Sequence, residues 1–276
     1  MNTDGLITAT KEPRTSRRSR AVGSQLSIRL RQFVALAVGF GIWESVVRFG
    51  LVDPFVLPAP ISIGQRVLEL TWSGELFIHV YATTLEMMGG FVLGAGLGVM
   101  AGMGLALAPR IAETLDPFIV VLNGLPRAAL APLFVVWLGI GLSSKIAIGA
   151  SIVFFICLFA THMGMRTTDP MLLRAIEALG ATPRQLLIKV RLPSTLPWIL
   201  TALKSSVGMS LIGAVIGELV AASRGLGWYI AYSAGNFDTK GIFAGLFALG
   251  VMAITIDTLV AKLGERLTRW RPDLIA

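Results

Sequence analysis

Cysteine and histidine are scarce in this chain of 276 residues. The single cysteine, Cys157, excludes an intramolecular disulfide and a metal site built from several cysteines. The two histidines, His79 and His162, lie in different segments, so they lack the spacing of two metal ligands on one helix. We therefore expect no metal site and no cofactor.

Nucleotide-binding and catalytic motifs are also absent from the sequence. It contains neither GxxxxGKS nor GxxxxGKT, the glycine-rich loops that cradle the phosphates of ATP. No nucleophile with an adjacent base, and no cluster of Asp, Glu and His, marks a catalytic centre. We expect a chain that is not an enzyme, so any ATP hydrolysis would have to come from a separate ATPase subunit.

Charged residues make up only 14% of the chain, whereas hydrophobic residues make up 54%. Soluble globular domains carry about 25% charged residues, so this composition indicates a membrane protein. A spanning segment must satisfy its backbone hydrogen bonds internally, and we expect an all-α protein with about six transmembrane helices of ~20 residues. We place the spans near residues 32–50, 82–107, 117–140, 146–163, 197–221 and 241–262.

Basic residues lie mainly on one side of these spans. They are frequent in the N-terminal segment, in residues 163–197 and after the last span, whereas the opposite side has Arg48, Arg66, Lys145, Arg224 and Lys240. Cytoplasmic loops carry an excess of Lys and Arg, so we expect both termini and residues 163–197 to be cytoplasmic. The net charge of +8 also invites a nucleic-acid interpretation, but basic residues that follow the membrane argue against that partner.

Composition divides the chain into three parts. Residues 1–30 are polar and rich in Arg, Ser and Thr, without the apolar run of a cleavable signal peptide. We expect them to form a disordered basic tail in the cytoplasm. Residues 31–270 would form the transmembrane domain, and residues 271–276 a short C-terminal tail.

One polar segment, residues 163–197, separates two hydrophobic stretches and has the signals of two short helices. Asp169 can cap a first helix that begins at Pro170. Gly180 can end this helix, because glycine readily adopts a positive φ.

The second helix of this segment would begin at Pro183, where Thr182 and Gln185 have the spacing of a capping box. We expect it to stop before Pro193, because a proline disfavours the helical conformation of the residue before it. Each helix has an apolar stripe, so the pair suits docking to another protein better than a plain loop on the membrane surface would.

The same segment resembles the signature cytoplasmic loop of ABC-type importer permeases, the membrane subunits of bacterial ATP-driven importers. That loop reads Glu-Ala-Ala, three residues, Gly, nine residues and Ile-x-Leu-Pro. The register matches at Gly180, Val190, Leu192 and Pro193. At the Glu-Ala-Ala positions the sequence has Arg174, Ala175 and Ile176, and Glu177 lies three places late.

Other stretches resemble the nitrate, sulfonate and taurine branch of that family, over roughly residues 40–270. They are LPAP after the first span, TTLEMMGGF, LNGLPRAALAPLFVVWLGIG and GELVAASRGLGWYI. It is the combination of these stretches that is specific.

The resemblance implies a type I ABC importer permease fold with six transmembrane helices and a cytoplasmic coupling-helix loop, in a bacterial inner membrane. The chain would be the pore-forming subunit for a small solute such as a sulfonate, nitrate or similar anion. Its partners would be the lipid bilayer, a second permease subunit in a homodimer, two cytoplasmic ABC ATPases and a periplasmic or lipid-anchored solute-binding protein. The ATPases would contact the loop at Arg174, Ala175, Glu177, Gly180, Val190, Leu192 and Pro193.

Polar residues inside the spans are candidates for the translocation path. In the third span, Asn123 and Arg127 share one face as an inner gate or anion passage, although Arg127 could equally extend to the lipid headgroups. In the fifth span, extension to the headgroups is the favoured alternative for Lys204. Glu218 of that span could instead accept hydrogen bonds from the backbone of residues 223–227, a role we hold equal to one in the path.

Four glycines of the second span, Gly90, Gly94, Gly98 and Gly102, recur at a spacing of four. Such a ridge of small residues lets the backbone of another helix approach closely, and we expect tight packing along it. Two other functional classes stay open. A secondary transporter or channel predicts inverted repeats and charges in several central spans, and a membrane-embedded enzyme needs a cluster of catalytic side chains.

Overall fold

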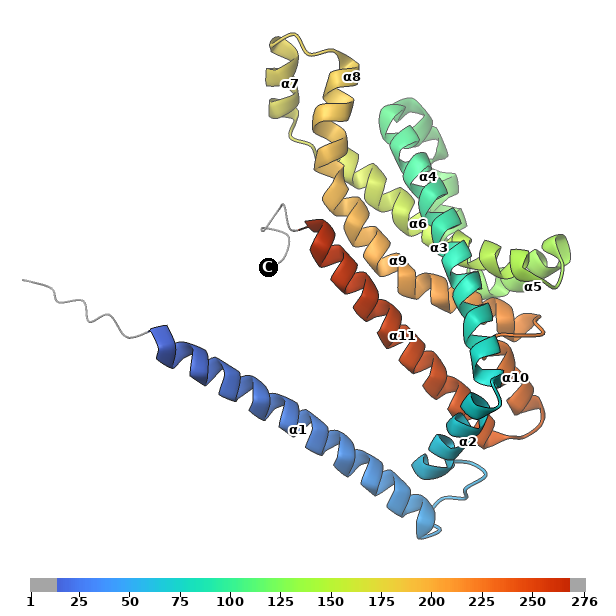
Figure 1. Cartoon of the computed structure of the whole chain (residues 1–276). Helices are drawn as coiled ribbons and strands as arrows, with labels where there is room; N and C mark the ends of the chain where they lie inside the picture. Colours follow the sequence, from blue (N-terminus) through green and yellow to red (C-terminus); the bar gives the residue numbers. More distant parts are fainter. Residues whose placement is uncertain (1–13, 269–276) are drawn as a thin grey trace, which may run out of the picture. The chain divides into compact units, whose positions relative to one another are not determined.

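The computed structural model describes the backbone of residues 14–268 and the side chains of residues 30–262 (Figure 1). This part of the chain is helical and contains no strand, so the all-α prediction is confirmed. Its helices are α1 (Arg14–Arg48), α2 (Pro60–Trp72), α3 (Glu75–Leu107), α4 (Pro109–Gly124), α5 (Arg127–Leu138), α6 (Leu142–Arg166), α7 (Pro170–Ala178), α8 (Pro183–Leu186), the π-helical segment η1 (Leu187–Arg191), α9 (Leu192–Val220), α10 (Leu226–Gly235) and α11 (Thr239–Thr268).

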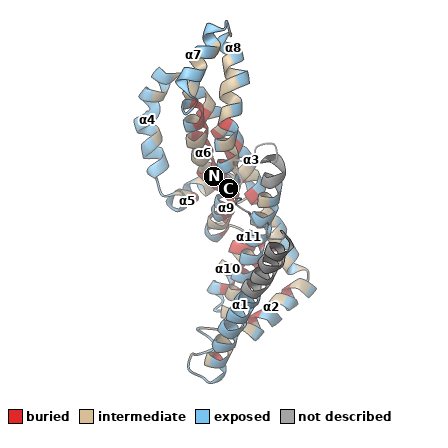
Figure 2. Cartoon of the chain, turned by 90° about the vertical axis from the view of Figure 1, so that its left-hand side faces the viewer, coloured by how far each residue is buried: buried red, intermediate tan, exposed pale blue. Residues whose placement is uncertain are grey.

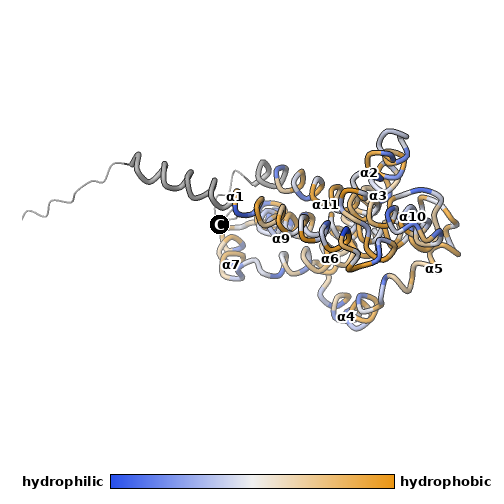
Figure 3. The backbone as a smooth tube through the Cα atoms, turned by 90° about the horizontal axis from the view of Figure 1, so that it is seen from below, coloured by the Kyte–Doolittle hydropathy of each residue, from blue (hydrophilic) through white to orange (hydrophobic). Residues whose placement is uncertain are grey.

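Five helical stretches within the described residues are long and apolar enough to cross a membrane. They are Leu30–Arg48, Glu75–Leu107, Leu142–Arg166, Pro183–Val220 and Thr239–Lys262. The bent pair of α4 and α5 makes a sixth span if it is counted as one. Hydrophobic residues recur along α6 and α9 in Figure 3, and the prediction of about six spans is confirmed.

The chain divides into two units, residues 1–62 and residues 63–276. In the first unit, Glu44 ties the end of α1 to the segment that opens α2. Its Oε1 accepts a hydrogen bond from Nε of Arg48 at 2.7 Å, and its Oε2 accepts one from the N–H of Ile61 at 3.2 Å. The carboxylate therefore links the last turns of α1 to Ile61 within this unit.

The start of α1 differs from the disordered tail that we expected over residues 1–30. The helix begins at Arg14, so residues 14–30 are helical, whereas residues 1–13 lie outside the described part of the chain. This stretch contains no proline after Pro13 and leads directly into an apolar helix. Extending an existing helix is much easier than nucleating one, so the polar residues continue the span backwards.

The glycine ridge of α3 packs against α6 in the second unit. A Cβ at Gly94 would lie 2.5 Å from the carbonyl oxygen of Ala150, and one at Gly102 would lie 2.5 Å from that of Leu158. Real Cβ atoms do not approach so closely, so only glycine permits this separation of the two helices. The predicted close packing is thus confirmed, and α6 is the neighbour.

Helix α6 also packs closely against α9, again through glycine. A Cβ at Gly213 of α9 would lie 2.5 Å from Cα of Gly149 in α6. On the α3 side, Ser210 Oγ of α9 donates to the carbonyl oxygen of Met87 at 2.7 Å. Helices α3, α6 and α9 therefore form the core of this unit, and Figure 2 shows their buried residues in red.

The third span is not the continuous helix that we expected over residues 117–140. Helix α4 ends at Gly124 and α5 begins at Arg127, and the two axes meet at 94°. Between them Leu125 has ψ 131° and Pro126 has ψ 111°, both extended values. Pro126 has no N–H to continue the helix and keeps Leu125 out of the helical conformation, which explains the break.

Candidate functional site

The polar segment between α6 and α9 begins with the short helix α7. Asp169 Oδ1 accepts a hydrogen bond from the N–H of Met171 at 2.8 Å, and Pro170 is the first helical residue. At the other end Gly180 has φ +88°, and its N–H donates to the carbonyl oxygen of Glu177 at 2.9 Å. The predicted cap, start and terminal glycine of this helix are confirmed.

The second helix of the segment begins with a capping box, as predicted. The Gln185 N–H donates to Thr182 Oγ1 at 3.3 Å, and the Thr182 N–H donates to Gln185 Oε1 at 2.8 Å. Each of the two residues donates its backbone N–H to the side chain of the other, and these bonds fix the start of α8.

The expected stop before Pro193 is wrong. Helical structure runs without interruption from Pro183 to Val220, through α8, the π-helical segment and α9 (Figure 1). In η1 the backbone turns are wider than in an α-helix, and the N–H of Leu192 donates to the carbonyl oxygen of Leu187. The wider turn makes room for the proline ring, so the helix passes Pro193 without a break. The loop and the span are therefore one helix.

The surface of α7 and α8 is exposed. Neither helix has a buried residue, and the apolar side chains of Met171 and Leu179 are 79% and 86% exposed. The candidate ATPase contacts divide into an exposed and a half-buried group. Arg174, Ala175, Glu177, Gly180 and Pro193 are exposed, and Val190 and Leu192 are half-buried.

Arg127 lies at the bend between α4 and α5. Its Nη1 donates to the carbonyl oxygen of Leu122 at 2.8 Å, and its Nη2 donates to that of Asn123 at 3.3 Å. The guanidinium also lies 4.6 Å from the centroid of the Phe155 ring. Arg127 thus caps the carbonyl groups that the break leaves without helical donors, and it contacts the backbone of Asn123, its predicted neighbour.

Lys204 and Glu218 are not brought together, as the spacing along α9 predicts. Lys204 is exposed and has no ion-pair partner among the described residues. Glu218 is 1% exposed, and its Oε1 accepts a hydrogen bond from Thr83 Oγ1 at 2.7 Å. The two residues therefore occupy different environments at opposite ends of one helix.

The turn between α9 and α10 is held by side chains at its backbone N–H groups. The N–H of Gly225 donates to His79 Nδ1 at 3.1 Å, and that of Leu226 donates to Thr83 Oγ1 at 2.9 Å. The N–H of Gly227 donates to Glu218 Oε2 at 2.6 Å. Glu218 therefore accepts a backbone hydrogen bond within residues 223–227, which is the first of the two roles expected from the sequence. A role for Glu218 in translocation stays a prediction.

Glycine is required in this turn. Gly225 has φ +116°, and a Cβ there would collide with the carboxyl group of Glu218. A Cβ at Gly227 would lie 2.9 Å from Glu218 Oε2. The sequence around the turn thus leaves room for a buried carboxylate below it.

A second carboxyl group and a lysine complete this buried polar cluster. Glu86 Oε1 lies 3.8 Å from Lys145 Nζ, which also donates to the carbonyl oxygen of Gly141 at 3.1 Å. The side chains of Glu86 and Lys145 are only 6% and 5% exposed. Glu86 Oε2 is also buried and has no hydrogen-bond partner among the described residues.

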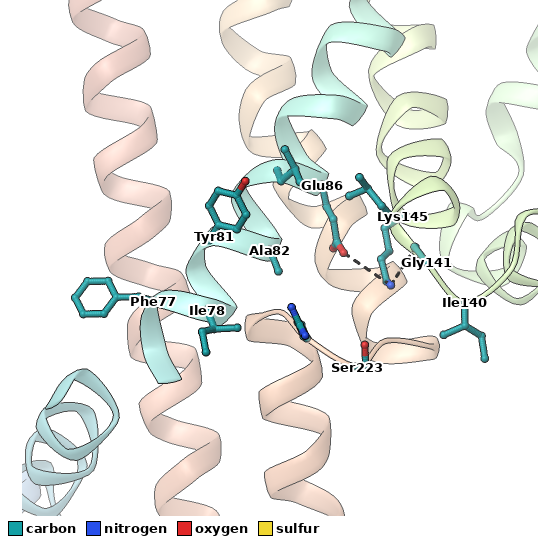
Figure 4. A pocket seen from close by; sticks show the side chains of 12 residues that line it. Phe77, Ile78, Tyr81, Ala82, Glu86, Ile140, Gly141, Lys145 and Ser223 are labelled. Atoms are coloured by element: carbon teal, nitrogen blue, oxygen red, sulfur yellow. Dashed lines mark hydrogen bonds and ion pairs between the residues drawn. The ribbon is translucent and has the colours of Figure 1, made fainter. Parts of the chain in front are cut away.

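A cavity of about 590 Å³ opens beside this cluster (Figure 4). Helix α3 contributes Phe77, Tyr81 and Glu86 to its wall, and the N-terminal turn of α6 contributes Lys145. The turn after α9 contributes Arg224. The cavity therefore combines an apolar wall with ionisable groups from three elements.

Comparison with known proteins decides the family of the chain. The family model "Binding-protein-dependent transport system inner membrane component" matches residues 94–270. The chain belongs to this family. It is an ABC importer permease, a multi-pass membrane subunit that is itself non-catalytic, and ATP hydrolysis is carried out by a separate ATPase. The alternatives of a secondary transporter, a channel and a membrane enzyme are thereby set aside.

Two relatives cover most of the permease. It is 35% identical over 235 residues to SsuC of Bacillus subtilis, a permease protein named for aliphatic sulfonates transport, with 85% of each chain covered. It is 34% identical over 230 residues to the formylaminopyrimidine transport permease ThiX of Halalkalibacterium halodurans, with 83% of this chain and 91% of ThiX covered.

A solved structure supports the fold. An inward-facing structure of the MetNI methionine ABC transporter matches 73% of the permease and 97% of its own chain, with a TM-score of 0.55 and 22% identity. The expected type I importer permease fold is therefore confirmed.

Sequence reasoning singled out Glu218 but missed the other members of its cluster in the permease. His79, Thr83 and Glu86 stand at i, i+4 and i+7 in α3, a spacing that places them on one helix face. A polar stripe of this kind in an apolar span was a signal in the sequence. The part played by Lys145 carried no comparable signal, because it depends on how α6 packs against α3.

Arg66 links α2 to the turn before α11. Its Nη2 binds Asp238 Oδ2 at 3.3 Å, and its Nη1 binds Glu69 Oε2 at 3.2 Å. Burial lowers the pKa of Arg66, but the contacts with Tyr229, Glu69 and Asp238 raise it more, so the net pKa is above its usual value. The guanidinium therefore stays charged and holds α2 in place.

Proposed function

We propose that the permease is the pore-forming subunit of an importer for a small organic anion, with aliphatic sulfonates as the leading class of solute. The relative SsuC, named for aliphatic sulfonates transport, supports this class. The relative ThiX is named for formylaminopyrimidine, which makes a pyrimidine the second candidate.

The observation that carries an ATP-coupled mechanism is the continuous helix from Pro183 to Val220. Its first turns belong to the exposed loop and its remainder to a span, with no flexible turn between them. A displacement of α8 by an ATPase would therefore move α9 directly. We infer that ATPase closure tilts this span and exposes the path to each side in turn.

The loop would be the ATPase contact because its apolar side chains are exposed beside charged ones. Arg174, Ala175 and Glu177 lie on the exposed surface of α7, and Gly180 provides the sharp turn between α7 and α8. Val190, Leu192 and Pro193 lie where the loop becomes the span, so they would transmit the movement rather than bind the ATPase.

A complete importer would contain two permease copies as a homodimer, two cytoplasmic ABC ATPases and a periplasmic or lipid-anchored solute-binding protein. Helix α4 supports the second copy, because it has no buried residue and exposes apolar side chains such as Phe118 and Val121. The distribution of basic residues supports a cytoplasmic position for the loop and both termini.

A path for an anion would run along the exposed face of α9. Thr201, Lys204, Ser205 and Gly208 share this face and are exposed, whereas Ser206 and Ser210 are buried in the core. A polar stripe on a membrane span needs water or protein beside it, which supports a path between two copies. Asn123 and Arg127 would shape the bend of the third span, and Glu218 would hold the outer turn.

Reconstitution tests this function. Proteoliposomes with the permease, its ATPase and its solute-binding protein should accumulate radiolabelled butanesulfonate only when ATP is present. Met171→Asp and Leu179→Asp should abolish co-purification of the ATPase, because each places a charge on an exposed apolar contact. Phe49→Asp is the matched control, since Phe49 is 82% exposed but lies outside the loop. Accumulation without ATP, or normal co-purification of both loop variants, would contradict the proposal.

A further inference from the structure

The charges around the cavity beside α3, α6 and the α9–α10 turn do not balance. Glu218 is already bonded by Thr83 and the N–H of Gly227. Glu218 does not line the cavity, whereas Glu86 does. Glu86 is the one acidic residue among the cavity-lining residues, and its Oε1 lies 3.8 Å from Lys145 Nζ. The cavity wall therefore carries a single carboxyl group.

Two cations face this single carboxyl group. Lys145 is 5% exposed, yet its ammonium group has only the Gly141 carbonyl oxygen at 3.1 Å and the Glu86 carboxyl group at 3.8 Å as partners. An ammonium group carries three N–H donors, so a buried lysine with these partners is incompletely bonded. Arg224 lines the cavity, is exposed, and has no ion pair or hydrogen bond to another described side chain.

Most of the remaining wall of the cavity is apolar. Leu85 of α3 and Leu142 of α6 line it together with Phe77 and Ile78, and Figure 4 shows Phe77 and Ile78 on the side away from Lys145. Its volume of about 590 Å³ lies within the range of small-molecule sites. A molecule that matches both parts carries one oxyanion group and a short hydrocarbon portion.

We propose that this cavity binds the solute itself, with Lys145 and Arg224 receiving its oxyanion group and the α3 wall receiving its hydrocarbon portion. The proposal rests on the import of a small organic anion proposed above and names a site for it within one permease subunit. Arg224 lies in the turn that His79, Thr83 and Glu218 hold, so the buried cluster acts as the support of the site. An anionic lipid also combines an oxyanion group with a hydrocarbon portion. The experiment therefore distinguishes a bound lipid from the bound solute.

Direct binding to the assembled permease–ATPase complex tests the site without the solute-binding protein. The complex is placed in nanodiscs of phosphatidylcholine, and binding of radiolabelled butanesulfonate is measured. We expect saturable binding that Arg224→Gln weakens about ten-fold, the effect of losing one charge-assisted hydrogen bond. Lys240→Gln is the matched control, because Lys240 is exposed and does not line the cavity.

The outcomes separate this proposal from the proposed function. Absence of saturable binding to the wild-type complex, or equal binding by Arg224→Gln and Lys240→Gln, overturns the cavity site even where ATP-dependent uptake is intact. Binding without uptake in the complete importer supports the site and contradicts the transport proposal. Where Lys145→Met assembles with wild-type thermal stability, it should weaken binding like Arg224→Gln, and unchanged binding by that variant also overturns the site.

A second set of nanodiscs contains phosphatidylglycerol in place of half of the phosphatidylcholine. The affinity for butanesulfonate should be the same in both lipids if the solute is the occupant. Loss of butanesulfonate binding in the phosphatidylglycerol discs identifies a lipid headgroup as the occupant and overturns the assignment to the solute.

Discussion

Replacement of Glu218 separates a supporting role from a role in the path. In Glu218→Ala, the N–H of Gly227 loses its acceptor, and a void replaces the buried carboxyl group. Thr83 loses less, because its hydroxyl group also lies 3.1 Å from the carbonyl oxygen of His79. A buried donor left unsatisfied costs ~1–3 kcal/mol, and the void adds a similar amount.

We therefore expect Glu218→Ala to destabilise the permease by about 2–5 kcal/mol. For a chain of this size the melting temperature should fall by roughly 10 °C. The melting temperature of Glu218→Gln should fall much less, because the amide oxygen can accept from the N–H of Gly227 while the amide NH₂ group donates to Thr83 Oγ1. Both variants lack the charge of Glu218, so their difference in stability comes from the hydrogen bonds that the side chain at position 218 can make.

Thermal unfolding of the purified permease–ATPase complex and butanesulfonate uptake are measured for both variants. Glu113→Ala is the control, because Glu113 is an exposed glutamate of α4. The Gln variant should keep most of the uptake and the Ala variant should lose it together with stability. If both variants are as stable as the wild type but equally poor in uptake, the charge belongs to the path and the supporting role is refuted.

Three further predictions concern the loop, the ridge and the topology. Gly180→Val should uncouple ATP hydrolysis from uptake in proteoliposomes, because φ +88° strains a β-branched residue, and normal coupling would contradict this. Gly94→Leu should lower the yield of folded protein on size exclusion, whereas Gly96→Leu, in open space, should not, and equal yields would argue against the ridge. A reporter fused at Asn236 should be periplasmic and one at Arg184 cytoplasmic, and the opposite pattern would reverse the orientation.

Local features of the fold could be predicted well from the sequence. The caps at Asp169 and Thr182 and the positive φ of Gly180 depend on residues only a few positions apart. The glycine ridge of α3 could be predicted because its spacing matches the helical repeat, although the neighbour could not. The basic residues of α1 show the limit of this reasoning, since their polarity suggested disorder while the adjoining helix extended through them.

The membrane class, the approximate spans and the two capped helices of the loop could be predicted from the sequence, because hydropathy and capping act over short distances along the chain. The continuation of the loop helix through Pro193 could be seen only in the folded structure, since the π-helical turn that accommodates the proline is a geometric adjustment of a long packed helix. The folded structure also places Glu86 of α3 beside Lys145 of α6, and Glu218 of α9 beside Thr83 of α3. These residues come from three helices, and their meeting depends on the close packing of α3, α6 and α9 through glycine.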